Sequence, residues 1–283
     1  MKKTAYYLAI AAVLGFTACN RSAEQEEQAM QDSLTALPDT LSGEKKEMVE
    51  FKLFYTLANL PSPLELINSI YSNDIPFNSE LLNNPDKETG YSSAYKKAVN
   101  YGVYGVDMAY AAFYGENQDL INQYMVAKKM AGRLNISSTF DQFTSQFEEN
   151  KGNKDSLVTI IDRAYAETDA YLRKNNRSMA AAQALAGAVI EVQYISLQVM
   201  KSEVMNDKNR QVFENIYKQK LYLDNLINLM EELKSDKDCA KLLADLQSQK
   251  KVFDSIRTLE DLTSENMMKM ADAVAATRSA IVG

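Results

Sequence analysis

Apolar residues recur at steps of three and four along almost the whole chain after residue 43, which is the period of an amphipathic α-helix. In the segment 154–175, for example, Leu157, Ile161 and Ala164 share one helical face. No segment alternates apolar and polar residues between turn formers, so the pattern predicts an all-α array or bundle of about nine to ten helices. The predicted helices are residues 45–59, 63–72, 91–114, 117–134, 139–149, 154–175, 178–205, 209–233, 238–256 and 264–281.

The helical pattern is interrupted between Tyr71 and Gly90, where the chain holds two prolines and several turn-forming residues. Proline removes a backbone N–H and breaks a helix interior. We expect an irregular connection here, which is either a functional loop or a packed connector.

Two of the predicted helices, residues 98–114 and 179–199, are apolar and rich in small residues nearly all round. Such helices lie at the centre of a protein, and Gly and Ala allow their backbones to approach closely. Each contains one acid within its apolar run, Asp107 in the first helix and Glu191 in the second. A buried carboxylate costs several kcal/mol unless it is paired or hydrogen-bonded, so each acid needs a partner.

The two acids are the best candidates for a functional site, because tyrosines lie near them at helical spacing. If the two central helices pack face to face, the carboxylates and phenols line one polar pocket for a sugar, a cation or an amine. The predicted ligand-binding residues are Asp107, Tyr104, Tyr110, Tyr114, Glu191 and Tyr194.

Two other roles for the same acids are compatible with the sequence. In the first, each acid is satisfied by a tyrosine hydroxyl, a helix N-terminus or an arginine such as Arg133, Arg163 or Arg177, and fixes the register of the helices. In the second, the pair of carboxylates hydrolyses a glycosidic bond. We favour the structural role over a ligand site, and a ligand site over catalysis.

The composition excludes most catalytic mechanisms that depend on histidine, since the 283 residues include no His. Without His there is no imidazole base, no Ser-His or Cys-His pair and no His-ligated metal. The ten glycines are scattered and form no phosphate-binding loop, and the net charge of −7 argues against nucleic acid as a partner. We therefore expect a protein without enzymatic activity, cofactor or metal site.

The N-terminus has the pattern of a secretory signal peptide. Lys2 and Lys3 precede an apolar stretch over residues 5–14, which is too short to span a bilayer, and small residues then lead to Cys19. The ending FTAC resembles the lipobox of bacterial lipoproteins, with Phe where Leu is usual. That resemblance implies a signal peptide of residues 1–18 that is cleaved before the cysteine.

The lipobox resemblance also implies that Cys19 is acylated on its sulfur and on the new amine, with palmitate-type chains. Such chains anchor a protein permanently, and the outer membrane is the expected location. Residues 19–44 are polar and acidic, which is typical of a disordered tether. The acids after Asn20 resemble the export tether of surface lipoproteins in Bacteroidetes-type bacteria, although a tether that is simply soluble would suit the periplasmic face equally well.

Residues 45–283 are expected to form a single helical domain. A shift of 84 residues aligns Asp107 with Glu191, which suggests two diverged halves, residues 45–149 and 150–281. Chance similarity between two Ala-rich helices explains the same alignment.

The body is similar to helical lipoproteins of Bacteroidetes-type bacteria. The similarity lies in the lipobox and in residues 60–63, 102–110 and 186–194. This resemblance implies no particular activity, so the expected function is a lipid-anchored envelope protein that binds a partner protein or scaffolds a complex. A small-ligand binder is the alternative, and a carboxylate-dependent hydrolase is the weakest hypothesis.

The lipid anchor gives the first testable prediction. Replacing Cys19 with Ser, or treating cells with globomycin, should leave the uncleaved precursor, because lipoprotein signal peptidase requires the acylated cysteine. Immunoblotting of membrane fractions would show the heavier band. Normal processing of the Cys19→Ser chain would contradict the anchor.

Overall fold

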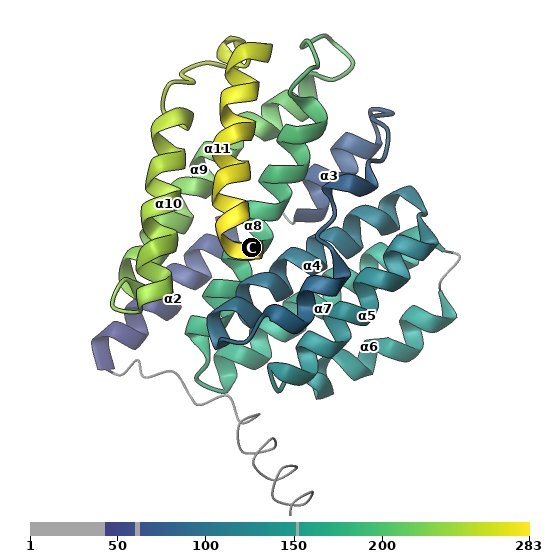
Figure 1. Cartoon of the computed structure of the whole chain (residues 1–283), viewed down its shortest axis with the longest axis vertical. Helices are drawn as coiled ribbons and strands as arrows, with labels where there is room; N and C mark the ends of the chain where they lie inside the picture. Colours follow the sequence, from purple (N-terminus) through teal and green to yellow (C-terminus); the bar gives the residue numbers. More distant parts are fainter. Residues whose placement is uncertain (1–42, 60–62, 151–152) are drawn as a thin grey trace, which may run out of the picture. The chain divides into compact units, whose positions relative to one another are not determined.

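The computed structural model describes residues 43–59, 63–150 and 153–283, so the predicted signal peptide, Cys19 and nearly all of the predicted tether lie outside the described residues. The described part of the chain consists of α-helices and short 3-10 helices without a strand, which confirms the predicted all-α fold (Figure 1). The α-helices are α2 (Gly43–Asn59), α3 (Pro63–Tyr71), α4 (Ala94–Tyr114), α5 (Asn117–Arg133), α6 (Ser137–Glu149), α7 (Lys154–Lys174), α8 (Ser178–Met200), α9 (Arg210–Leu233), α10 (Lys237–Phe253) and α11 (Ser264–Val282). The 3-10 helices are η1 (Ser79–Leu81), η2 (Pro85–Gly90) and η3 (Leu259–Asp261).

The largest difference from the predicted boundaries is the end of α8, which stops at Met200 and not at residue 205. Hydrogen bonds of asparagine side chains stabilise the loop that follows α8. The backbone N–H of Asn206 donates to Oδ1 of Asn209 at 2.8 Å, and Nδ2 of Asn209 donates to the carbonyl of Val204 at 3.0 Å. Such side-chain hydrogen bonds offer the backbone an alternative to helical hydrogen bonds. They cannot be predicted from the spacing of apolar residues, which is why the helix was predicted too long.

Local signals at both ends define α4. Oγ of Ser93 accepts a hydrogen bond from the backbone N–H of Lys96 at 3.1 Å, which caps the first turn. At the other end Gly115 adopts a left-handed conformation, with φ of 70°, and its N–H bonds back to carbonyls of the last turn.

The helices α4 and α8 form the centre of the fold and cross at a reciprocal pair of glycines. A Cβ on Gly102 would lie 1.9 Å from the carbonyl oxygen of Ala184, and a Cβ on Gly187 would lie 1.8 Å from that of Val99. The contact is reciprocal. Each glycine packs against the backbone carbonyl of the residue that lies three positions before the glycine of the other helix. Only glycine permits so close an approach, which explains the small residues in both apolar helices.

The other helices surround this central pair. Helix α4 contacts α3, α5 and α7, whereas α8 contacts α9 and α11. Helix α10 packs on α9 and α11, α2 packs on α9, and α6 packs on α7. All described residues belong to one compact unit, and the proposed division into halves stays a prediction.

Helix α8 is long and apolar enough to cross a membrane by length and composition. However, 78% of its apolar window is buried inside the body. Its all-round apolar surface is thus covered by neighbouring helices, as expected for a central helix.

The crossing gives the second prediction. Changing Gly187 to Ala should destabilise the protein by about 1–3 kcal/mol, because the new methyl group overlaps a backbone carbonyl that cannot rotate away. Chemical denaturation would measure the change. The control is Gly132→Ala in α5, where the added Cβ meets only Oγ of Ser137 at 3.6 Å and raises helix propensity. Equal effects of the two substitutions would show that the close crossing does not require glycine.

Candidate functional site

The irregular segment between α3 and α4, residues 72–93, lies along the tyrosine face of α4, and we call it the strap. Three phenols of α4 hydrogen-bond to its backbone. These contacts join Tyr114 Oη to the carbonyl of Ile75 (2.6 Å), the N–H of Asn78 to Tyr110 Oη (3.0 Å), and Tyr104 Oη to the carbonyl of Asn84 (2.8 Å). The tyrosines at helical spacing therefore hold a connector that has little regular hydrogen bonding of its own.

Asp107 lies in the same row and is completely buried. Its Oδ2 accepts a hydrogen bond from the backbone N–H of Asn83 in the strap at 2.9 Å. Its Oδ1 receives no N–H or O–H donor from the described residues, and the Asp107 carboxyl group lies within hydrogen-bonding reach of Glu191. The α4–α8 crossing thus brings the two acids together, which the sequence left as a possibility that depended on how the two helices pack.

Glu191 is also completely buried and forms a bidentate ion pair with Arg278 of α11. Nε of the arginine lies 2.6 Å from Oε2 of the glutamate, and Nη2 lies 2.7 Å from Oε1. Nη2 also donates to the carbonyl of Leu81 in the strap at 3.0 Å, and the guanidinium lies 4.2 Å from the centre of the Tyr194 ring. Two parallel hydrogen bonds are the strongest arrangement for such a pair.

Burial and the charge of Glu191 shift the pKa values of Asp107 and Arg278. Burial raises the pKa of Asp107 well above its ordinary value of 3.8, and the neighbouring charge of Glu191 raises this pKa further. Burial lowers the pKa of Arg278, but the raising effects, of which the charge and the hydrogen bonds of Glu191 are the largest, together outweigh burial and hold this pKa above its usual range. Burial and the charge of Glu191 therefore favour the neutral form of Asp107, whose proton is then available to Glu191. We call the three residues the buried triad.

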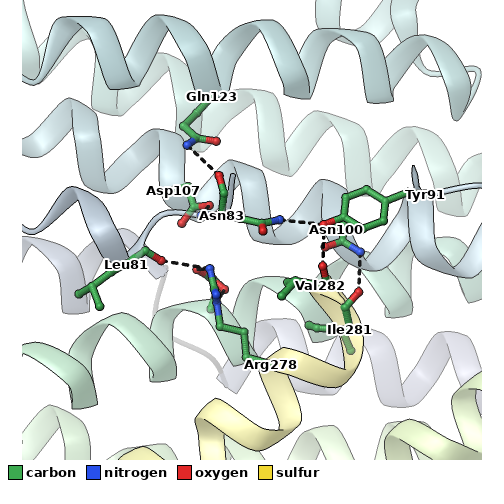
Figure 2. Close-up of polar contacts among 10 residues, drawn as sticks. Leu81, Asn83, Tyr91, Asn100, Asp107, Gln123, Arg278, Ile281 and Val282 are labelled. Carbon is green, nitrogen blue, oxygen red and sulfur yellow. Dashed lines mark hydrogen bonds and ion pairs between the residues drawn. The ribbon is translucent and has the colours of Figure 1, made fainter. Parts of the chain in front are cut away.

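Further polar side chains connect the triad to the last turn of α11 (Figure 2). The strap residue Asn83 is central to this network. The hydrogen bonds run from Gln123 Nε2 to the Asn83 carbonyl (3.2 Å), from Asn83 Nδ2 to Tyr91 Oη (3.0 Å), from Tyr91 Oη to the Val282 carbonyl (3.2 Å) and from Asn100 Nδ2 to the Ile281 carbonyl (2.9 Å). Carbonyls at the end of α11 thus find donors from α4 and the strap, which stabilises a helix terminus.

The arginine that pairs with Glu191 is not one of the three proposed from sequence. Arg133 pairs instead with Glu88 at 2.9 Å, Arg163 lies over a phenylalanine ring, and Arg177 donates to a backbone carbonyl. Arg278 follows Glu191 by 87 residues in the chain, and no local pattern links the two. Only the packing of α11 on α8 brings them together.

The predicted ligand-binding residues are thus occupied by contacts within the protein. Three of the tyrosines bind the strap, Tyr194 lies against Arg278, and both acids are fully enclosed. This arrangement matches the structural role that was favoured from sequence. A ligand role for the same six residues is not tested by it and stays a prediction.

The structure contains a separate cavity of about 470 Å³, which sequence patterns did not reveal. It lies among α2, α3, α4, α7, α8 and α9, and neither triad acid lines it. Its lining includes Leu64, Tyr101, Gly105, Tyr165, Thr168, Leu172, Ala181, Ala184, Ala188, Val192 and Tyr222. The signal that could have revealed the cavity is the row of alanines on α8. Small side chains along one face of a helix leave space beside that face unfilled.

One wall of the cavity depends on a second close approach. The phenol of Tyr165 occupies the place that a Cβ on Gly105 would take, and its Oη is buried with no partner among the described residues. Tyr101 Oη, by contrast, lies 3.3 Å from Oγ1 of Thr168. The described residues contain no group of three or more Asp, Glu or Cys side chains that could hold a metal ion.

No family model matches the chain, and neither the curated proteins nor the solved structures include a significantly similar one. The resemblance to helical envelope lipoproteins therefore stays a prediction from the motifs.

The protonation of Asp107 gives the third prediction. Since its native pKa is raised, the proton stabilises the folded state fully below pH 3.8, and this stabilisation is lost as the pH rises through the native pKa. Asp107→Asn removes this titration, keeps an oxygen that accepts from the Asn83 N–H, and places an N–H donor where the neutral acid has its O–H. The variant should gain free energy of unfolding relative to the wild type by up to about 1.4 kcal/mol per pH unit above pH 4. Parallel pH profiles of wild type and variant would contradict a neutral Asp107.

The matched comparison is Glu191→Gln, which leaves the guanidinium of Arg278 buried without its carboxylate. Breaking a buried pair from one side costs about 3–5 kcal/mol. Glu191→Gln should therefore destabilise the protein much more than Asp107→Asn at pH 7, in the same denaturation experiment.

Proposed function

We propose that the protein is a lipid-anchored binding module of the cell envelope, without catalytic activity, and that it holds a small, mainly apolar ligand in the cavity between α7 and α8. The observation that supports this proposal is the cavity itself. Its volume of about 470 Å³ falls within the range of about 300–1,000 Å³ that is typical of small-molecule sites. Concave, mostly apolar pockets of this size are rare on a protein and are the usual location of a ligand.

The buried triad does not favour the polar ligands considered from sequence. A sugar, a cation or an amine would have to reach two completely buried carboxylates, and it would have to displace the Arg278 guanidinium and the strap N–H that already contact them. Hydrolysis of a glycosidic bond would in addition need both carboxylates to reach substrate and water. The triad is better explained as the element that fixes α4, α8, α11 and the strap relative to one another.

The anchor and the location belong to the same proposal. The lipobox resemblance supports acylation of Cys19 and attachment to the outer membrane, at its periplasmic face or at the cell surface. A flexible tether of about 25 residues would keep the helical body close to that membrane while leaving it free to move relative to the anchor. The motifs that support the anchor and the cavity that supports binding are independent observations.

The fourth prediction tests the cavity as a binding site with the uncharged apolar fluorophore N-phenyl-1-naphthylamine. The folded wild-type protein should bind it, with an increase in fluorescence and a higher melting temperature. Ala184→Leu places a larger side chain in the cavity and should weaken binding at least tenfold. The control Ala180→Leu changes a similarly half-buried alanine of the same helix outside the cavity, and should bind normally. Absence of binding to the wild type would overturn the proposed function.

A further inference from the structure

We propose that the ligand of the cavity is an uncharged ring compound with a hydrogen-bond donor, which pairs with Oε1 of Gln219, and an acceptor, which pairs with Oη of Tyr165. This inference rests on the proposed function and specifies its ligand. Three features of the cavity support it: two buried polar atoms without a partner, the aromatic side chains of the lining, and the engaged charges beside them.

Gln219 of α9 contributes an amide to the cavity lining. The residue is 2% exposed, and its Nε2 donates to the carbonyl of Asn215, one turn earlier, at 3.3 Å. Its Oε1 is buried and receives no hydrogen bond from the described residues. A buried acceptor without a donor costs free energy, and a ligand in the adjacent cavity that supplies an N–H or O–H removes this cost.

Tyr165 of α7 contributes the second polar atom. Its Oη lies where a Cβ on Gly105 would be and is buried with no partner among the described residues. Burial raises the pKa of this phenol well above its usual value of 10, so the hydroxyl keeps its proton and remains a donor at neutral pH. Tyr101 differs, because its Oη already lies 3.3 Å from Oγ1 of Thr168. The lining thus offers a ligand an acceptor in Gln219 and a donor in Tyr165.

Aromatic side chains from four helices line the same cavity. They are Phe54 of α2, Tyr101 of α4, Tyr165 of α7 and Tyr222 of α9. Aromatic rings favour offset-stacked or edge-to-face contacts with other rings, and such contacts add to the gain from burying apolar area. The alanines that α8 contributes at helical spacing leave space for a ring system of this kind.

The charged residues that line the cavity already have partners within the protein. Nε and Nη2 of Arg173 both lie 2.8 Å from Oδ2 of Asp169. Asp162, the third charged residue of the lining, is also engaged in an interaction within the protein. A charged ligand would lose its hydration in the cavity without meeting an unengaged opposite charge among these residues, so the site favours an uncharged one.

Three tricyclic compounds of nearly the same shape test the two hydrogen bonds. Carbazole carries an N–H donor, 9-fluorenone carries a carbonyl acceptor, and fluorene carries neither. Each compound is used below its solubility limit to displace N-phenyl-1-naphthylamine from the folded wild-type protein. Carbazole and 9-fluorenone should each bind about fivefold more tightly than fluorene, which is the net effect of a single hydrogen bond. Fluorene binding as tightly as either of the other two would overturn the inference.

Conservative substitutions assign each hydrogen bond to its residue. Tyr165→Phe removes only the hydroxyl, so it should abolish the preference for 9-fluorenone over fluorene and keep the preference for carbazole. Gln219→Met removes the amide and should have the opposite effect. Each preference is a ratio of affinities within one variant, with the affinity of the fluorophore measured for that variant, so a general loss of affinity does not alter it.

Matched controls should keep both preferences. Tyr101→Phe removes a hydroxyl of the same lining that already has a partner, and Gln183→Met changes a buried glutamine of α8 that does not line the cavity. Unchanged preferences in Tyr165→Phe and Gln219→Met, or their loss in the controls, would overturn the assignment of the two bonds.

Failure of the inference can be distinguished from failure of the proposed function. If the fluorophore binds and Ala184→Leu weakens its binding, but the three tricyclic compounds bind equally, the hydrogen-bonding ligand is wrong and a binding cavity stands. If the fluorophore itself does not bind to the folded protein, both are wrong.

Discussion

The ion pair between Glu191 and Arg278 constrains more of the structure than any other single contact. Removing both ions from water costs several kcal/mol each, and their attraction offsets this cost only when the geometry is good and the remaining donors are satisfied. Here the bidentate contact is completed by the carbonyl of Leu81 and by the ring of Tyr194. A displacement of α8, α11 or the strap would leave a buried charge without a partner, so the pair fixes all three together.

Asp107 extends this constraint to α4 through its proton. An ionised Asp107 would place two carboxylates side by side in a completely buried site, whereas the neutral acid accepts the strap N–H and can donate to Glu191. The reciprocal glycines of α4 and α8 act in the same direction, since they permit only one close crossing of the two backbones. Electrostatics and steric fit therefore specify the same arrangement, as expected of a fold with a single stable packing.

The sequence predicted those parts of the site that depend on local pattern. The two apolar helices, the acid in each and the tyrosines beside Asp107 all follow from helical spacing, and the acids do meet. Arg278 could not be predicted in the same way, because its partner is 87 residues distant and its own helix shows no polar stripe that points to it. The strap was recognised as irregular from its prolines, but its backbone partners on α4 depend on the tertiary fold. The cavity was missed for a further reason, since a space is defined by side chains from six helices and belongs to no single segment.

The two faces of α4 explain why the triad and the cavity coexist in one small body. Residues two apart on a helix point in nearly opposite directions. Asp107 therefore faces the strap, while Gly105, two residues earlier, lies under the phenol of Tyr165 at the cavity. The polar face holds the connector and the ion pair in place, and the opposite face contributes Tyr101 and Gly105 to the cavity wall. Because α4 is held on both sides, the cavity wall is fixed before any ligand arrives, and binding need not include the cost of ordering it.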